Sequence, residues 1–158
     1  MEKVGILVIS YGSRAAAMID AFVRSEEYAP KIYVADKQKN PFNVKRAEKH
    51  MVIPDLNVKE ILRFAKRHED HIDFGIVGPE KPIIAGVRDI IEKETRIQMI
   101  CPTRRYAIEA SKIVQRQLFQ KVAPEVNPKF KVFDPKDYSS TIQVKKSVYA
   151  WLKELGNQ

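Results

Sequence analysis

The feature that most constrains the fold is an alternation of two patterns along the first 121 residues. Short apolar runs, rich in β-branched residues, stand at 4–9, 31–36, 50–54, 73–78 and 97–101. Such runs are typical of strands buried on both faces of a parallel sheet. Segments with apolar residues at helical spacing lie between them, at 15–23, 58–69, 83–93 and 104–121. The alternation predicts an α/β fold, a doubly wound parallel sheet with helices on both faces.

The remaining segments are less regular. "KQKNPFN", residues 37–43, is polar and is predicted to be a loop. "VAPEVNPKF", residues 122–130, contains two prolines and is typical of a linker, and the run 130–133 is predicted to be a short strand. The sequence ends with an amphipathic helix over 141–155. The alternation of strands and helices thus ends after residue 121, and one strand with one helix cannot form a second core alone.

Composition narrows the classes of function. The chain has 158 residues, 44% of them hydrophobic and 30% charged, as in ordinary globular domains. A formal net charge of +8 favours acidic partners in general, such as phosphorylated small molecules, nucleic acid or an anionic surface. The basic residues form no long tract, which disfavours nucleic acid. With one cysteine, Cys101, and no apolar stretch near 20 residues, we expect a soluble cytoplasmic protein without disulfides.

Polar residues after the first strand indicate an anion site. Ligands of open parallel sheets bind outside the carboxyl ends of the strands. Gly12 and Ser13 permit a tight turn there, and Arg14 follows at the start of a helix. Backbone N–H groups at a helix N-terminus, together with a guanidinium group, suit a phosphate group. An ordinary β–α turn with a solvated arginine is the alternative.

A second group of residues follows the strand at 73–78. Gly78 and Pro79 form a turn that holds Glu80 at the rim of the sheet, and Asp89 lies in the next helix. A carboxylate accepts hydrogen bonds from two hydroxyl groups at once, so Glu80 is a candidate for binding a ribose. A Gly-Pro turn with a solvated glutamate is the alternative. Asp36, at the end of the second strand, is a candidate either for a ribose hydroxyl or for capping a loop.

Three segments together resemble one enzyme family. "IVGPEKPIIAGVRDII", residues 76–91, resembles the V-G-P-E-x-P-L-x-x-G-x-x-D motif of phosphoribosylamine–glycine ligases, also called glycinamide ribonucleotide synthetases. "CPTRRYAIEASKIVQRQLFQK", residues 101–121, resembles the G-P-(T/S)-(K/R)-x-A-A-x-(I/L)-E-x-(S/N)-K segment of the same family. "VGILVISYGSRAAAMIDAF", residues 4–22, resembles its opening, V-L-V-I-G-x-G-G-R-E-H-A.

The resemblance implies a Rossmann-like N-terminal α/β substrate-binding domain over 1–103. Over 104–158 it implies a linker helix and the truncated beginning of an ATP-grasp module. Family members are carbon–nitrogen ligases that use ATP to join glycine to 5-phosphoribosylamine, through a glycyl phosphate, in de novo purine biosynthesis. It also implies ATP and Mg²⁺ as cofactors, bound mainly by parts outside this chain. The chain alone is then expected to be an inactive fragment.

The resemblance also assigns binding roles. It gives substrate binding to Gly12, Ser13, Arg14, Gly78, Pro79, Glu80 and Asp89, and ATP binding to Lys112. It places no catalytic residue and no metal ligand in this chain. Ser10 and Ser13 stand where the family has glycine, and Ala15-Ala16 stand where it has Glu-His. These differences leave the phosphate loop as the least secure part of the assignment.

Two other readings remain. One is a stand-alone or repurposed domain that binds a sugar phosphate or nucleotide, and the other is part of a different purine-pathway ATP-grasp ligase. The expected partners are phosphoribosylamine, glycine and ATP, with no membrane, and self-association through the last helix is a further expectation. The histidines at 50, 68 and 71 do not form a metal set, and Cys101 is expected to be a small buried hydrophobe.

Overall fold

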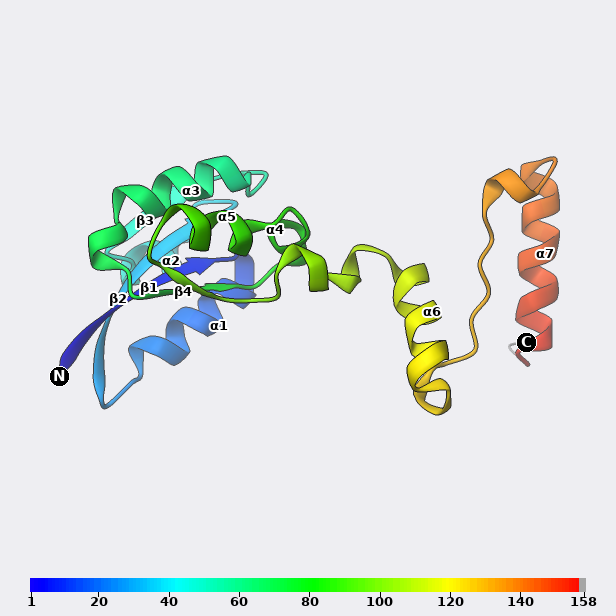
Figure 1. The fold of residues 1–158 in the computed structure, drawn as a ribbon, viewed down its shortest axis with the longest axis horizontal. Helices are drawn as coiled ribbons and strands as arrows, with labels where there is room; N and C mark the ends of the chain where they lie inside the picture. Colours follow the sequence, from blue (N-terminus) through cyan, green and yellow to red (C-terminus); the bar gives the residue numbers. More distant parts are fainter. Residues whose placement is uncertain (157–158) are drawn as a thin grey trace. The chain divides into compact units, whose positions relative to one another are not determined.

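The computed structural model describes residues 1–156 and divides into two compact units, Met1–Ala110 and Ser111–Gln158 (Figure 1). The first unit is built on a five-stranded sheet in the order β3-β2-β1-β4-β5, and all its neighbouring strands are parallel. The strands are β1 Glu2–Ile9, β2 Tyr28–Asp36, β3 Lys49–Val52, β4 Phe74–Val77 and β5 Gln98–Ile100. The helices of this unit are α1 Gly12–Val23, α2 Pro41–Arg46, α3 Val58–Arg67, α4 Glu80–Ile84 and α5 Val87–Glu94.

Alternate side chains of the central strand serve two different cores. Ile6 and Val8 pack with Ile19 of α1 on one face, and Phe42 of α2 lies against the same cluster. Leu7 and Ile9 belong to the larger cluster on the other face, beneath α3, α4 and α5. Because both faces are covered, β1 is apolar at every position from Ile6 to Ile9, as the sequence pattern predicts.

The connections confirm the doubly wound α/β prediction. From β1 the chain passes outward to β2 and β3, returns to place β4 beside β1, and continues outward to β5. In Figure 1, α1 lies on one side of the sheet and α3 and α5 on the other. The order of the strands therefore reverses between β1 and β4. The connection after β1 leads to α1 on one face of the sheet, and the connection after β4 leads to α4 on the other face.

The predicted loop at 37–43 is wrong in its second half, because α2 begins at Pro41. The side chain of Asn40 caps this helix, with its Oδ1 accepting a hydrogen bond from Phe42 N at 2.9 Å. Proline at the first helical position loses no hydrogen bond that the helix needs. A good cap and a favourable proline thus stabilise a six-residue helix that has no readable periodicity.

The helix predicted over 83–93 is interrupted at Gly86. This glycine has φ +83°, the left-handed region, and it separates α4 from α5. The long helix predicted over 104–121 is wrong in its first part and confirmed from residue 112 onward. Two single 3₁₀ turns, Arg104–Tyr106 and Ile108–Ala110, precede α6, Lys112–Val122.

The second unit consists mainly of helices α6 and α7, the latter spanning Thr141–Glu154. Ser111 caps α6 and Ser140 caps α7, each through its side-chain oxygen. The strand predicted over 130–133 is absent from the described part of this unit, where no neighbouring strand exists to pair with it. Every side chain described in this unit is exposed or half-buried.

Candidate functional site

The carboxyl ends of β1 and β4 form the candidate site. These strands are hydrogen-bonded neighbours, with Ile9 opposite Val77, and Gly78 N donates to Ile9 O at 2.9 Å. The loop after β1 leads to α1 on one face, and the loop after β4 leads to α4 on the other face. Open parallel sheets bind ligands in the crevice at such a reversal of strand order. The structure thus brings together the two segments that the sequence singled out separately.

The N-terminus of α1 is open to an anion. Tyr11 precedes the helix without a side-chain capping hydrogen bond, and the first turn contains no acidic residue. Gly12 has φ +60°, and no atom lies within 4 Å of the place where its Cβ would be. Residues 11–14 line a hollow of about 190 Å³. Free helical N–H groups beside an open backbone are a favourable setting for a phosphate oxygen.

Arg14 links the two loops of the site. Its guanidinium Nη1 donates a hydrogen bond to the carbonyl oxygen of Gly78, at 2.5 Å. Gly78 in turn permits the close approach, because a Cβ at this position would overlap with Ser10 Oγ and lie 2.9 Å from Arg14 Cδ. The predicted arginine therefore contacts the same turn that contains Pro79 and Glu80.

Glu80 is exposed at the first position of α4. Pro79 before it is buried and extended, with φ −90° and ψ 152°, and so fixes the direction in which the helix starts. The carboxylate and the Arg14 guanidinium both belong to the carboxyl edge of the sheet. This edge thus presents one basic and one acidic side chain, together with the amides of α1.

Two residues at this edge were missed by the sequence-based assignment. Ser10 is fully buried at the end of β1, and its Oγ has no hydrogen-bond partner in the described part of the chain. The Lys37 ammonium group lies 4.4 Å from the centre of the Tyr11 ring, which adds a second cation beside the α1 loop. The replacement of a family glycine by Ser10 was a signal in the sequence, whereas nothing there indicated the position of Lys37.

Comparison with known proteins identifies the family of this chain. A family model described as phosphoribosylglycinamide synthetase, N domain, matches residues 4–109. The chain belongs to this family. A phosphoribosylamine–glycine ligase of Methanocella arvoryzae is 36% identical over 133 residues, which cover 84% of this chain and 30% of the relative. One of Pyrococcus furiosus is 30% identical over 141 residues, covering 88% of this chain and 31% of the relative.

The chain thus spans about 30% of the length of these relatives. Among solved structures, an N5-carboxyaminoimidazole synthetase from Staphylococcus aureus aligns with a TM-score of 0.62 at 10% identity, over 95% of this chain and 37% of that one. A structure described as glycinamide-RNase-transformylase T from Mycobacterium tuberculosis aligns with a TM-score of 0.52 at 15% identity, over 75% of this chain and 35% of that one. At such identities the likeness concerns the fold, and it confirms the α/β class.

The other residues that resemble the motifs of the phosphoribosylglycinamide synthetase N domain are placed differently. The Asp89 carboxylate accepts a hydrogen bond from Arg104 N at 2.9 Å, so it holds the segment after β5 against α5. Lys112 lies in the second unit, at the start of α6, and its Nζ is 3.3 Å from Gln115 Oε1. Their assignments to substrate and ATP stay predictions.

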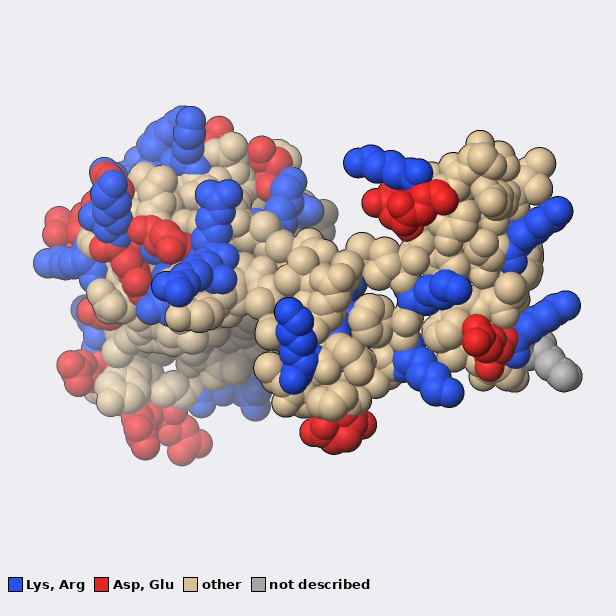
Figure 2. Space-filling view, turned by 45° about the vertical axis from the view of Figure 1, so that its right-hand side comes forward, with Lys and Arg blue, Asp and Glu red and all other residues tan. Residues whose placement is uncertain are grey.

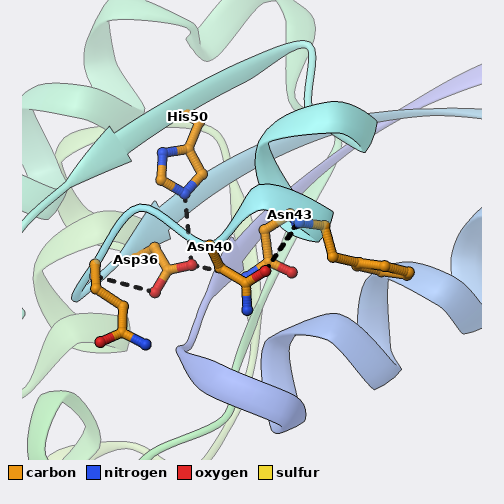
Figure 3. A network of polar contacts seen from close by, with 6 residues as sticks. Asp36, Asn40, Asn43 and His50 are labelled. Carbon is orange, nitrogen blue, oxygen red and sulfur yellow. Dashed lines mark hydrogen bonds and ion pairs between the residues drawn. The ribbon is translucent and has the colours of Figure 1, made fainter.

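Asp36, at the end of β2, is the sequence-based candidate for binding a ribose hydroxyl. Its carboxylate is instead buried and hydrogen-bonded to other residues of the chain (Figure 3). Its Oδ2 accepts a hydrogen bond from Asn43 Nδ2 at 2.7 Å and lies 3.4 Å from His50 Nε2. Its Oδ1 accepts one from Gln38 N at 3.3 Å. With no exposed surface, Asp36 serves to fasten α2 and β3 to the sheet.

Cys101 and the histidines provide neither a reactive thiolate nor a metal site among the described residues. Burial raises the pKa of the Cys101 thiol to about 11, so it is protonated at neutral pH. Within residues 1–156, no group of three or more His, Cys, Asp or Glu side chains is arranged to hold a metal ion.

In the same range, no helix has the length and apolar character that crossing a membrane requires. On the face shown in Figure 2, basic side chains are interspersed with acidic ones.

Proposed function

We propose that this chain binds the sugar-phosphate substrate of a phosphoribosylamine–glycine ligase. The observation that carries the proposal is the contact between Arg14 and Gly78, which joins the anion-binding loop of α1 to the turn of Glu80. The membership of the chain in the phosphoribosylglycinamide synthetase N-domain family supports it.

In this role the residues divide the substrate between them. The N–H groups of the first turn of α1 and the Arg14 guanidinium bind the 5-phosphate, since both offer donors and positive charge. Gly12 leaves the backbone open for close approach of the phosphate. Glu80 accepts hydrogen bonds from the ribose hydroxyls. These residues act by holding and orienting the substrate.

The proposal assigns ATP and Mg²⁺ mainly to segments that the longer relatives contain and this chain does not match. The residues described here offer no metal-binding cluster, so no step is attributed to them through the ion. When bound by the rest of such an enzyme, ATP with Mg²⁺ supplies the phosphoryl group that activates glycine. This chain alone is therefore expected to bind substrate without forming the amide.

Isothermal titration calorimetry with glycinamide ribonucleotide and ribose 5-phosphate tests the proposal. Each charge-assisted hydrogen bond contributes about 1.5–3 kcal/mol, so Arg14→Ala and Glu80→Ala should each weaken binding by about 10- to 100-fold. Arg24→Ala, at the other end of α1, and Glu27→Ala, in the next loop, are matched controls and should change affinity less than about twofold. Lack of binding by the unmodified chain, or equal losses in the control variants, would refute the role.

A second candidate function is a stand-alone sugar-phosphate-binding domain. Ala15, where the family has glutamate, is fully buried on the inner face of α1, so this position has no group that can reach a ligand. The two functions differ in the part of the ligand that they recognise. A ligase domain should prefer glycinamide ribonucleotide to ribose 5-phosphate, whereas a general sugar-phosphate domain should bind the two with equal affinity.

A further inference from the structure

A second hollow lies at the opposite edge of the sheet, by the amino ends of the strands. Its volume is about 580 Å³, within the range of sites that hold small ligands. Strands β1, β2 and β3, the end of α3 and the turn at 69–71 all contribute to its wall. The wall carries the basic side chains Lys3, Lys31, Lys49 and Arg67 and the imidazoles of His68 and His71.

The acidic groups of this hollow are already engaged. Glu48 Oε2 pairs with Lys31 Nζ at 2.9 Å, and Asp70 Oδ1 pairs with Arg96 Nη2 at 3.1 Å. Asp73 Oδ2 accepts a hydrogen bond from the backbone N–H of Gly5 at 2.7 Å. The backbone N–H is neutral, so Asp73 keeps its negative charge, and it is the one carboxylate of this hollow that forms no ion pair among the described residues.

Three of the cations, by contrast, have no such partner. In the described part of the chain, Lys3, Lys49 and Arg67 form no ion pair with any carboxylate. Arg67 lies in the last turn of α3, where the helix dipole favours a cation. Lys3 and Lys49 come from the strands β1 and β3, so the dipole of α3 does not account for them.

The pKa of the neighbouring His68 side chain also responds to these cations. His68 packs between Tyr33 and Phe64, with ring centres 5.3 and 5.0 Å away. Burial lowers the pKa of His68, and the cations of Arg67 and Lys49 lower it further. A proton is therefore unfavourable at this ring, first because the ring is partly buried and second because these cations are near.

We propose that this hollow is a second binding site, in which Lys3, Lys49 and Arg67 hold a small polyanion with two negative charges. Three cations from separate elements line a concave space, and after the Asp73 carboxylate offsets one of them, two positive charges remain to balance such a ligand. The site lies at the opposite edge of the sheet from Arg14 and Glu80. It is independent of the proposed sugar-phosphate site and can hold its ligand while that site is occupied.

Titration with pyrophosphate, inorganic phosphate and citrate tests the proposal, followed by calorimetry and by the NMR signal of the His68 ring. His68→Gln identifies that signal. We expect saturable binding with a shift of the His68 signal, and at least a tenfold loss of affinity for Lys49→Ala/Arg67→Ala. Lys59→Ala/Arg63→Ala removes the same charge from α3 outside the hollow and should change affinity less than about twofold.

The outcomes separate the two sites. Binding of pyrophosphate and phosphate but not citrate identifies phosphate groups as the ligand chemistry, and equal binding of citrate identifies charge alone. Arg14→Ala should leave the shift of the His68 signal intact, even where it abolishes binding of glycinamide ribonucleotide. No saturable shift of that signal, or equal losses in the two double variants, would overturn the proposal and leave the sugar-phosphate site unaffected.

Discussion

Replacing Gly78 with alanine tests the contact between the ends of β1 and β4. A methyl group here would overlap with Ser10 Oγ, and it would lie 3.1 Å from Ser10 Cβ and 2.9 Å from Arg14 Cδ. Arg14 is exposed and can move aside, whereas Ser10 is fully buried. Ser10 is therefore the neighbour that determines the cost of the substitution.

The magnitude follows from these contacts. Adding one methyl group to a close-packed region costs about 1–3 kcal/mol of unfolding free energy. Ser10→Gly removes both the Oγ and the Cβ that the new methyl group meets, so most of this cost should vanish in the double variant. Ser10→Gly alone has opposing effects: it removes a buried unpaired hydroxyl, worth about 1–3 kcal/mol, and it adds about 0.5–1 kcal/mol of backbone entropy cost. The expected favourable coupling between the two substitutions is about 1–2 kcal/mol.

Urea unfolding of the four proteins, followed by far-ultraviolet circular dichroism, measures this coupling. Ser13→Gly combined with Gly78→Ala is the matched control, because Ser13 is exposed and is not among the nearest neighbours of a Cβ at Gly78. Its coupling should be close to zero. If Ser10→Gly and Gly78→Ala are additive within about 0.5 kcal/mol, the two residues do not meet as described and the argument for a shared site fails.

Three further predictions concern other parts of the first unit. Gly5→Ala should unfold the protein or lower its melting temperature sharply, because the methyl group would overlap with the His71 carbonyl and lie 2.9 Å from Ile72 Cα; a melting temperature unchanged in a thermal scan would contradict this. The Cys101 thiol, with its pKa raised by burial to about 11, should react with a disulfide reagent more slowly in the folded protein than in urea at the same mildly alkaline pH, and equal rates would contradict this. The pKa of His68 is lowered by burial and nearby cations, so the unfolded chain takes up a proton first as pH falls below 6.5. Unfolding free energy should therefore decrease from neutral to mildly acidic pH, and His68→Gln should reduce that decrease; an identical pH profile would count against the interpretation.

Much of the fold could be predicted because a strand that is buried on both faces of a sheet is apolar at consecutive positions of the sequence. The run Ile6–Ile9 is apolar at each position for this reason. Helix α2 left no such trace, since it is six residues long and its stability depends on the Asn40 cap. Gly86 was visible in the sequence, but its left-handed φ was not, so one predicted helix proved to be two.

The sequence predicted the parts of the candidate site and the edge of the sheet at which they meet, but not the contact that joins them. Glycine, arginine and glutamate after apolar runs indicate strand ends that suit a ligand. The contact between Arg14 and Gly78 spans 64 positions in the sequence and depends on β4 lying beside β1. The order of strands is a property of the whole sheet, which no local pattern specifies. Asp36 shows the reverse case, because a strand-end acid became part of the core through Asn43 and His50.

The absence of buried side chains among the described residues of the second unit has a consequence for local stability. Helices α6 and α7, of 11 and 14 residues, are near the length at which an isolated helix is marginal in water. Their amide hydrogens should exchange with deuterium well before those of β1, and proteases should cleave there first. Deuterium uptake would thus show that the sheet resists opening while helices α6 and α7 unfold and refold repeatedly.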